Sequence, residues 1–311
     1  VKPGGYADSK VFNTLYNSFE EKDRGAFNAA MNFYASGMKS IFLQDANSLI
    51  MKPDDLVFVL EHIKKCFPHV DRVTSYARSH TIVRIKQDDL KRMADAGLNR
   101  IHVGMESGSD TVLKKINKGA TKADHIKAGL KIKKAGMELS EYVMPGLGGI
   151  EYSIEHALET ASALNAINPD FIRIRTLAVT DGTILAEEAE KGEFEKPTDA
   201  MMAKELRLFL ESLDGIDSYI KSDHILNLFE TINGKFPEDK EKLIGIIDGF
   251  FNLDPEKRVL YQMGRRMGFF RGPDDMDTSP HLEKVKQACD QYGVTPQNID
   301  SVIDELMKRF V

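Results

Sequence analysis

Apolar positions along the first two thirds of the chain alternate between helical spacing and short continuous runs. The short runs predict strands at residues 41–43, 72–76, 100–105, 139–144 and 171–179. The helically spaced segments predict helices at residues 20–37, 53–66, 87–96, 110–116, 122–135 and 153–166. Strands that alternate with helices across short connections indicate an α/β fold with a parallel sheet covered by helices.

The two ends of the chain have different patterns. Residues 1–18 are predicted to be irregular, because Pro3, Gly4 and Gly5 are strong breakers of regular structure. After about residue 197 the pattern becomes helical, with helices predicted at residues 199–213, 223–232, 238–251, 254–268, 281–292 and 296–310. We therefore expect an α/β domain over residues 1–197 and a helical C-terminal extension over residues 198–311 that packs on it.

Composition narrows the function classes. The chain has 311 residues with 42% hydrophobic and 29% charged residues, which is ordinary for a globular protein. Its net charge of −6 argues against a nucleic-acid or anionic-membrane surface. No apolar run approaches the roughly 20 residues needed to span a bilayer. No signal-peptide pattern is seen, and two cysteines suggest a reducing, cytoplasmic location. We expect the clustered Arg265, Arg266 and Arg271 to form a solvated face.

The most informative segment is the strand and turn at residues 101–109. A short apolar strand ends in a polar, glycine-rich turn, and a helix then begins at Ser109 or Asp110, both good N-caps. Parallel sheets present ligand-binding groups at the carboxyl ends of their strands. Glu106 and Ser107 therefore stand where the hydroxyl groups of a ligand would bind.

The sequence Gly104-Met105-Glu106-Ser107-Gly108-Ser109, with Lys118-Gly119 ten residues on, resembles the radical S-adenosylmethionine (radical SAM) enzymes. The resemblance extends over about residues 19–275 and implies a partial (β/α)6 TIM-type barrel. Because the pattern opens on a helix, we expect the first barrel strand to be missing from this sequence.

The resemblance implies two cofactors, S-adenosylmethionine (SAM) and a [4Fe–4S] cluster. Together they generate a 5′-deoxyadenosyl radical that abstracts hydrogen from a substrate, here a small molecule or a compound of unknown class. A reductant such as flavodoxin or ferredoxin is the implied partner. The protein supplies position and water exclusion, and the cofactors supply the difficult chemistry.

The cluster ligands of this family are three cysteines spaced Cys-x-x-x-Cys-x-x-Cys. This sequence contains only Cys66 and Cys289, far apart and without a cysteine or histidine at ligand spacing. We therefore expect no metal ligands in the given sequence, with the cluster cysteines upstream of Val1. The given chain alone is then expected to be inactive.

The resemblance also implies a set of SAM-binding residues at successive strand ends. Glu106 and Ser107 would bind the ribose hydroxyls, and the forked donors of Arg78 match the two oxygens of the SAM carboxylate. The remaining positions are Asp45 and Asn47 for the amino group, and Met144, Gly146 and Thr176 around the adenine. Each has a purely structural alternative, such as Asp45 capping a turn or Glu106 being a solvated turn carboxylate.

Five further residues are candidates for substrate contact. Tyr76 follows a predicted strand, and Arg173 with Arg175 share one strand face because side chains alternate along a strand. The two arginines would bind an anionic substrate or, alternatively, form salt bridges to the helices. His224 and Asn227, three residues apart on a predicted helix, would contact substrate over the barrel mouth or serve in helix packing.

Two other function classes stay open. A barrel without a cluster would be a SAM- or nucleoside-binding protein. An ordinary TIM-barrel lyase would need a lysine or paired carboxylates at the strand ends, and the predicted ends supply Asp45 and Glu106 but no lysine. A metal hydrolase is disfavoured, because no predicted strand end carries clustered histidines.

Overall fold

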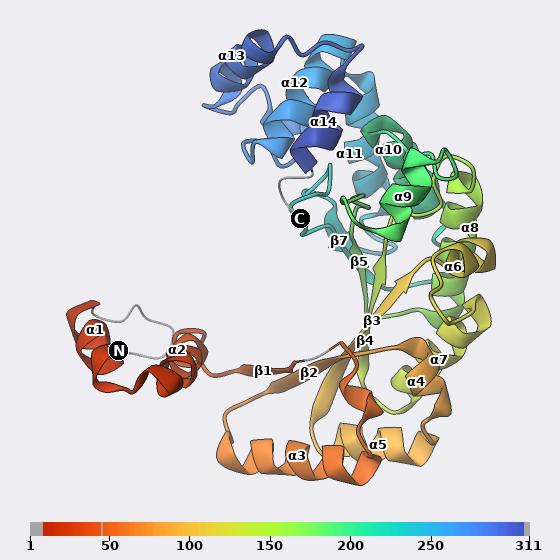
Figure 1. Cartoon of the computed structure of the whole chain (residues 1–311). Coiled ribbons are helices and arrows are strands. Elements are labelled where there is room, and N and C mark those ends of the chain that lie inside the picture. The colour runs from red at the N-terminus through yellow and green to blue at the C-terminus, as the bar shows by residue number, and fades with distance from the viewer. Residues whose placement is uncertain (1–8, 45, 308–311) are drawn as a thin grey trace.

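The computed structural model describes residues 9–44 and 46–307 (Figure 1). Its centre is a seven-stranded sheet in which the strands lie side by side in their order along the chain. The first six strands are parallel, and the seventh runs antiparallel to the sixth. The strands are β1 (Ser40–Leu43), β2 (Arg72–Ala77), β3 (Leu98–Glu106), β4 (Glu138–Val143), β5 (Phe171–Ile174), β6 (Tyr219–Lys221) and β7 (Asn233–Lys235). The predicted α/β class is confirmed, with an open sheet as a partial barrel requires.

Each connection between the parallel strands β1 to β6 contains at least one α-helix. The α-helices of the sheet region are α3 (Pro53–Cys66), α4 (Ser79–Arg84), α5 (Gln87–Asp95), α6 (Asp110–Lys115), α7 (Lys122–Lys134), α8 (Ser153–Ile167), α9 (Ile184–Glu190) and α10 (Asp199–Ser212). The later ones are α11 (Lys240–Asn252), α12 (Pro255–Arg266), α13 (Leu282–Tyr292) and α14 (Ile299–Met307). Helices α5, α7, α8 and α10 pack in sequence on one side of the sheet, which leaves the opposite face for ligands (Figure 1).

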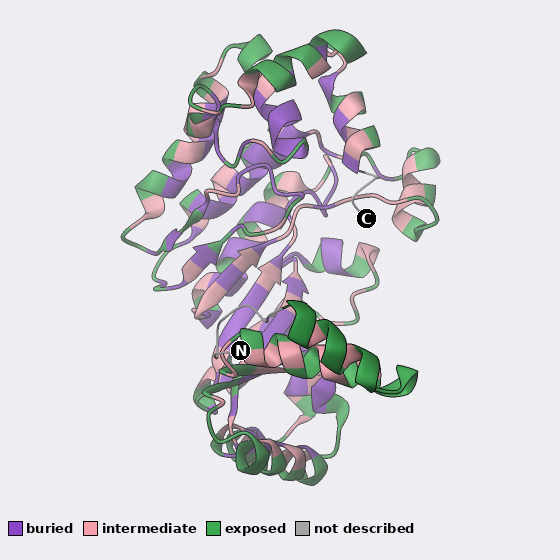
Figure 2. Cartoon of the chain, turned by 90° about the vertical axis from the view of Figure 1, so that its left-hand side faces the viewer, coloured by how far each residue is buried: buried purple, intermediate pink, exposed green. Residues whose placement is uncertain are grey.

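The hydrophobic core lies between the sheet and these helices. Buried residues run along the strands and the helix faces against them (Figure 2). Gly129 of α7 shows how closely the layers meet, because a Cβ there would lie 2.6 Å from Ile167 and 3.1 Å from Leu139. Each fully buried leucine or isoleucine contributes about 1.5–3 kcal/mol to folding.

The first described segment is helical, so the prediction of irregular structure there is wrong for residues 9–18. Helices α1 (Ser9–Ser18) and α2 (Glu21–Ala35) have no fully buried residue, yet their aromatic rings meet. The ring of Phe27 lies 5.4 Å from Phe12, 6.2 Å from Tyr16 and 5.0 Å from Phe19. These contacts give α1 an apolar partner that local breaker residues do not reveal.

The predicted helix at residues 223–232 is also wrong. Residues 222–232 form an irregular connection between β6 and β7, neither of which was predicted. Two side chains of α12 donate hydrogen bonds to backbone carbonyl oxygens of this connection. Arg266 Nη1 donates to Leu226 O at 2.6 Å, and Arg265 Nε donates to Asn227 O at 2.8 Å. The two arginines are only 3% and 4% exposed, so they do not form a solvated face.

Strand β5 is shorter than predicted, since it ends at Ile174. The residues beyond it stay attached to the sheet edge through backbone bonds, from Arg175 N to Val143 O at 2.9 Å and from Leu177 N to Pro145 O at 3.2 Å. The sheet continues past residue 197 through β6 and β7, and the domain boundary there stays a prediction. Among the helices in the described ranges, none has both the length and the apolar content to cross a bilayer.

Candidate functional site

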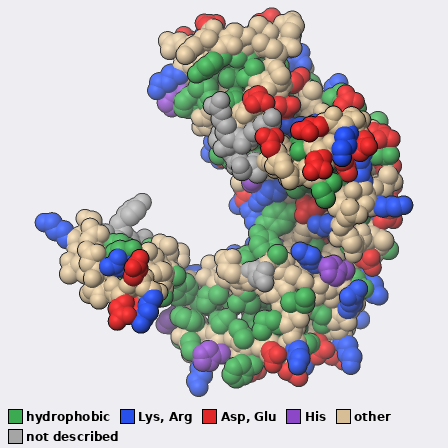
Figure 3. Space-filling model, viewed as in Figure 1, with side chains coloured by type: hydrophobic (Ala, Val, Ile, Leu, Met, Phe, Trp, Pro, Cys, Tyr) green, Lys and Arg blue, Asp and Glu red, His purple; other side chains and the backbone are tan. Residues whose placement is uncertain are grey.

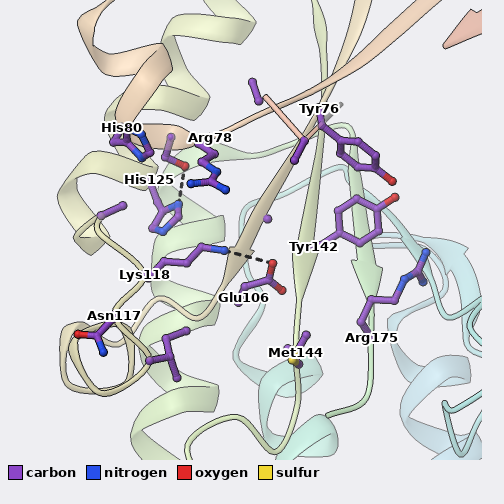
Figure 4. Close-up of a pocket in the computed structure, with 16 residues that line it drawn as sticks. Tyr76, Arg78, His80, Glu106, Asn117, Lys118, His125, Tyr142, Met144 and Arg175 are labelled. Atoms are coloured by element: carbon purple, nitrogen blue, oxygen red, sulfur yellow. Dashed lines mark hydrogen bonds and ion pairs between the residues drawn. The ribbon is translucent and has the colours of Figure 1, made fainter. Parts of the chain in front are cut away.

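A cavity of about 560 Å³ opens at the carboxyl ends of β2, β3 and β4 (Figure 4). This is the edge at which parallel α/β sheets bind their ligands. Its charged and aromatic lining includes Tyr76, Arg78, Glu106, Lys118, Tyr142 and Arg175. The volume lies within the range of about 300–1,000 Å³ typical of small-molecule sites.

Glu106 ends β3 in an unusual backbone conformation that aims its carboxylate into the cavity. Its φ is +64°, and the register with β4 shifts between Gly104 and Glu106. A Cβ on residue 104 would lie 2.3 Å from the Glu106 Oε1 atom. Gly104 therefore provides the space that the carboxylate occupies.

Lys118 holds the Glu106 carboxylate from the opposite side. Its Nζ lies 3.3 Å from Glu106 Oε1, with the two side chains 26% and 22% exposed (Figure 4). The lysine stands in the turn between α6 and α7, where Asn117 and Gly119 both have positive φ, +51° and +71°. The ion pair orients the carboxylate while leaving it partly open to the cavity.

An aromatic wall closes the other side of the cavity. Tyr76 lies on β2 and Tyr142 on β4, and their ring centroids are 6.2 Å apart. Their hydroxyl groups face each other (Figure 4). Burial and a hydrogen bond with Tyr76 raise the pKa of Tyr142. Beneath them, burial and the nearby arginine charges lower the pKa of His102 to about 4, so its ring is neutral at pH 7.

The start of α4 forms the third part of the lining. Asn47 fixes this turn, because its Oδ1 accepts from the Arg78 backbone N–H at 3.0 Å and its Nδ2 donates to Thr81 Oγ1 at 3.0 Å. The Arg78 side chain is exposed and lines the cavity. Ser79 Oγ lies 2.7 Å from Nδ1 of His125. Burial lowers the pKa of His125 to about 4.

Ser107 points away from the cavity and is fully buried. Its Oγ lies 2.8 Å from Nδ1 of His156 on α8. Burial lowers the pKa of His156 to about 4, so the ring is neutral at pH 7. Its Nε2 lies 3.0 Å from Met144 O. Because a carbonyl oxygen can only accept a hydrogen bond, Nε2 carries the ring proton and donates there, and Nδ1 accepts from Ser107 Oγ.

Glu205 of α10 continues this buried network. Its Oε1 accepts from the Gly146 N–H at 2.8 Å, and its Oε2 accepts from Ser153 Oγ at 2.5 Å. Burial raises the pKa of Glu205 to about 7, against weaker opposing effects of those two bonds. His156 Nε2 lies 3.6 Å from the carboxyl group, but with a neutral ring the contact is not an ion pair.

Thr176 and Asn227 bind each other rather than the cavity. Thr176 donates to Asn227 Oδ1 from its backbone N at 2.9 Å and from its Oγ1 at 3.1 Å. The Asn227 amide also donates to Ile174 O and to Ser222 Oγ, each at 2.9 Å. His224 lies in the same irregular connection, so it does not share a helix face with Asn227. This connection is thereby fixed to the end of β5.

Arg173 and Arg175 converge on one carboxylate, Asp223, in the connection after β6. Arg173 donates to Asp223 Oδ2, and Arg175 Nη1 donates to Asp223 Oδ1 at 3.0 Å. Burial alone would raise the pKa of Asp223, but the hydrogen bonds and charges of Arg175 and Arg173 outweigh it and hold the value at about 2. The arginines thus form salt bridges, although to this connection rather than to the helices.

The structure brings together part of the expected site. Tyr76, Arg78, Glu106, Met144 and Arg175 line the cavity, as do Lys118, Tyr142 and His125, which sequence reasoning did not select. Lys118 was within reach as part of the quoted motif, and Tyr142 lies two residues before Met144 on the same strand face. Asn47, Ser107, Gly146, Thr176, Arg173, His224 and Asn227 do not line it. Asp45 lies outside the described residues.

The described residues do not fit the ligand set of an iron–sulfur cluster. Across residues 9–44 and 46–307, no three His, Cys, Asp or Glu side chains are placed to hold a metal ion. Cys66 is exposed at the end of α3, and Cys289 is buried in α13.

Residues 24–161, somewhat less than half of the chain, match the family model described as the Radical SAM superfamily. The matched span contains the Glu106 turn and the first four strands. The resemblance in the sequence is therefore confirmed at the level of the superfamily.

Curated relatives match over shorter parts of their length. The chain is 28% identical over 128 residues to a tRNA uridine(34) acetyltransferase of Methanocaldococcus infernus, covering 41% of this chain and 24% of the relative. It is 22% identical over 186 residues to the heme chaperone HemW of Bacillus subtilis, covering 58% and 48%. The chain thus spans between about a quarter and a half of the length of these relatives.

Among solved structures, the archaeal Methanocaldococcus infernus Elp3 with an N-terminal deletion aligns with a TM-score of 0.47 at 19% identity, covering 60% of this chain and 48% of that one. Coproporphyrinogen III oxidase (HemN) of Escherichia coli aligns with a TM-score of 0.44 at 13% identity, covering 56% and 40%.

Proposed function

We propose that the cavity at Glu106 binds SAM and that the chain belongs to a radical SAM enzyme that also uses a [4Fe–4S] cluster. The observation that carries the proposal is the Glu106 carboxylate, held at 3.3 Å by Lys118 and directed into a cavity of about 560 Å³. Adjacent ribose hydroxyls are suitable donors to one carboxylate. The superfamily match over residues 24–161 supports the same ligand.

The residues of the cavity fit SAM. The Glu106 carboxylate, seated in the space that Gly104 leaves, would accept hydrogen bonds from the ribose hydroxyls. Arg78, exposed at the start of α4, would pair with the SAM carboxylate, because its planar fork matches two oxygens. Met144 lines the cavity next to Glu106 and would contact the adenosyl group. When bound, SAM supplies the deoxyadenosyl group with which this superfamily abstracts hydrogen.

The protein side chains then have distinct tasks. Glu106 and Arg78 would orient SAM, and Lys118 would hold the Glu106 carboxylate in place. Tyr76 and Tyr142 exclude water from the half of the cavity opposite Lys118 (Figure 4). The described residues hold no ligand set for the cluster.

The substrate is open. Two curated relatives are named tRNA uridine(34) acetyltransferases, so the comparisons do not support the expectation, drawn from the net charge, that nucleic acid is excluded. We retain a small-molecule substrate and a flavodoxin- or ferredoxin-type reductant as parts of the proposal.

Calorimetric titration of SAM into the chain tests the proposal. We expect Glu106→Gln to weaken SAM binding roughly 10- to 100-fold, the range for losing hydrogen bonds to a charged acceptor. Glu138→Gln is the matched control, since Glu138 pairs with Arg100 at the opposite end of the sheet. Equal SAM affinity of the Glu106 variant and the wild-type chain would disprove the assignment of this carboxylate.

A further inference from the structure

At the sheet opening, more cationic side chains surround the Asp223 carboxylate than are needed to balance its charge. Asp223 receives Arg173 and Arg175, and Lys221 Nζ lies 3.6 Å from its Oδ2. The side chains of the two arginines are 24% and 22% exposed, and that of Asp223 is 28% exposed. The two arginines thus share one negative charge in a partly desolvated place, where excess charge is costly, and Lys221 adds a third positive charge at its exposed margin.

The arginines also keep unused donors. The Nε of Arg173 is buried without a hydrogen-bond partner. Within the described part of the chain, Arg175 uses Nη1 for both of its hydrogen bonds, to Ile174 O and to Asp223 Oδ1, each at 3.0 Å. A guanidinium group offers five N–H donors in a fixed fork. The pair therefore has more donors than the Asp223 carboxylate uses, enough to hold a planar or tetrahedral oxyanion in its place.

This cation group adjoins the cavity at Glu106 through Arg175. Arg175 lines the cavity, and its guanidinium carbon lies 4.9 Å from the centre of the Tyr142 ring. Arg173 pairs with Tyr142 in the register of β4 and β5, and its Nη1 lies 3.3 Å from the Tyr142 hydroxyl. Figure 4 shows Arg175 and Tyr142 on one side and Lys118 with Arg78 on the other. Lysine and arginine side chains also gather beside hydrophobic surface in the hollow of Figure 3.

We propose that Arg173, Arg175 and Lys221 bind an oxyanion group of the substrate, a carboxylate or a phosphate, in the place that Asp223 holds here. The substrate class rests on the proposed SAM function, because the anion would stand across the cavity from the SAM-binding residues. Asp223 acts as an internal carboxylate that keeps the arginines aligned until the substrate anion replaces it. The half-buried position favours a small molecule over a nucleic acid.

The test measures binding of inorganic phosphate and, separately, of acetate at constant ionic strength, without SAM. We expect Asp223→Asn to bind at least one of them tenfold or more tightly than the wild-type chain, and which one distinguishes phosphate from carboxylate substrates. Adding Arg175→Gln to that variant should abolish the gain. Asp248→Asn, which removes the partner of Arg207 on the surface, is the matched control and should leave anion affinity unchanged.

No gain of affinity in a folded Asp223→Asn variant for either anion would overturn the proposal. So would tight, Arg175-dependent binding of a single-stranded RNA oligonucleotide with no binding of phosphate or acetate. If the variant does not fold, the wild-type chain gives a second test. Phosphate or acetate should then slow phenylglyoxal labelling of Arg173 and Arg175, but not of the surface residue Arg207, and equal labelling would overturn the proposal.

The outcomes for SAM and for the oxyanion are separable. Failure of anion binding with normal SAM binding leaves the proposed function and removes only the substrate class. Asp223-dependent anion binding in a chain that does not bind SAM retains the oxyanion site and removes the proposed function.

Discussion

Glu106 and Ser107 are neighbours in the sequence, yet they serve two different regions of the molecule. Glu106 faces the cavity with a side chain that is 22% exposed and has one cationic partner, Lys118. Ser107 faces the helices, is fully buried and joins His156 in a hydrogen-bonded network. The division follows the alternation along β3, because Gly104 and Glu106 line the cavity while Met105 and Ser107 are fully buried. One short motif therefore contains both ligand contacts and the frame that holds them.

The buried network of Ser107 and His156, on the helix-covered face of the sheet, should show the largest stability effect. His156→Ala removes a buried ring that contacts Ser107 Oγ and Met144 O. We expect a loss of about 3 kcal/mol in unfolding free energy, as for other large-to-small core changes that also leave polar groups unpaired. Denaturant unfolding measures it. A loss below about 1 kcal/mol would contradict the view that this network holds the turn.

A pH titration of stability should isolate Glu205. Its pKa rises from 4.5 in the unfolded chain to about 7 in the fold, so the folded state binds its proton more tightly. Stability is therefore lost as pH rises from about 4.5 to 7, by about 3 kcal/mol in total. Glu205→Gln should remove this loss and be more stable than wild type at pH 8. A difference between the two chains that does not change with pH would contradict the assignment.

As pH falls, the buried histidines change the free energy of unfolding in the opposite direction to Glu205. Folding lowers the pKa values of His102, His125 and His156 from 6.5 to about 4, so their stability contribution is lost as pH falls from about 6.5 to 4. Glu205→Gln leaves this acid loss in place, which separates the two effects in one experiment.

On the cavity side, Lys118→Met should reduce ligand binding more than stability. The ion pair is partly exposed, so its loss should change unfolding free energy by less than about 1 kcal/mol. SAM affinity should fall several-fold, because the Glu106 carboxylate loses the group that orients it. Calorimetry with parallel thermal unfolding measures both. A large stability loss with unchanged SAM affinity would show that Lys118 stabilises the fold instead of orienting Glu106.

The smallest effect is expected at Gly104. Gly104→Ala would place a Cβ 2.3 Å from Glu106 Oε1, so the flexible carboxylate must shift. We expect SAM affinity to fall about threefold, or about 0.7 kcal/mol, with stability nearly unchanged. Gly245→Ala is the matched control, because nothing lies within 4 Å of a Cβ there. Equal affinity in both variants would show that the carboxylate does not need this space.

The sequence predicted the elements whose patterns are local. The first four strands and helices α3, α5, α6 and α7 between them follow from apolar periodicity, whereas α4 was not predicted. The position of Glu106 follows from the turn after β3. The connection at residues 222–232 was not predictable in this way. Its apolar spacing resembles a helix, but Arg265 and Arg266 satisfy its carbonyl oxygens from a distant helix. Such a partner cannot be found from local sequence.

The site was predicted to a similar extent and for a similar reason. Strand ends identified Arg78, Glu106, Met144 and Arg175 as lining residues. The partner of Ser107 is His156 on α8, and the partner of Thr176 is buried Asn227. Both are consequences of tertiary contacts that periodicity does not contain.

The order of the strands has a consequence for how the chain reaches this structure. Because every strand lies beside its predecessor, from β1 to β7, each pairing joins neighbouring segments of the chain. Pairing each strand with its predecessor closes shorter loops than pairing distant strands would, which lowers the entropy cost of forming the sheet. The sheet can therefore grow one strand at a time as the polypeptide emerges during synthesis, and the edge that carries Glu106 forms before the α12 helix with its buried arginines exists.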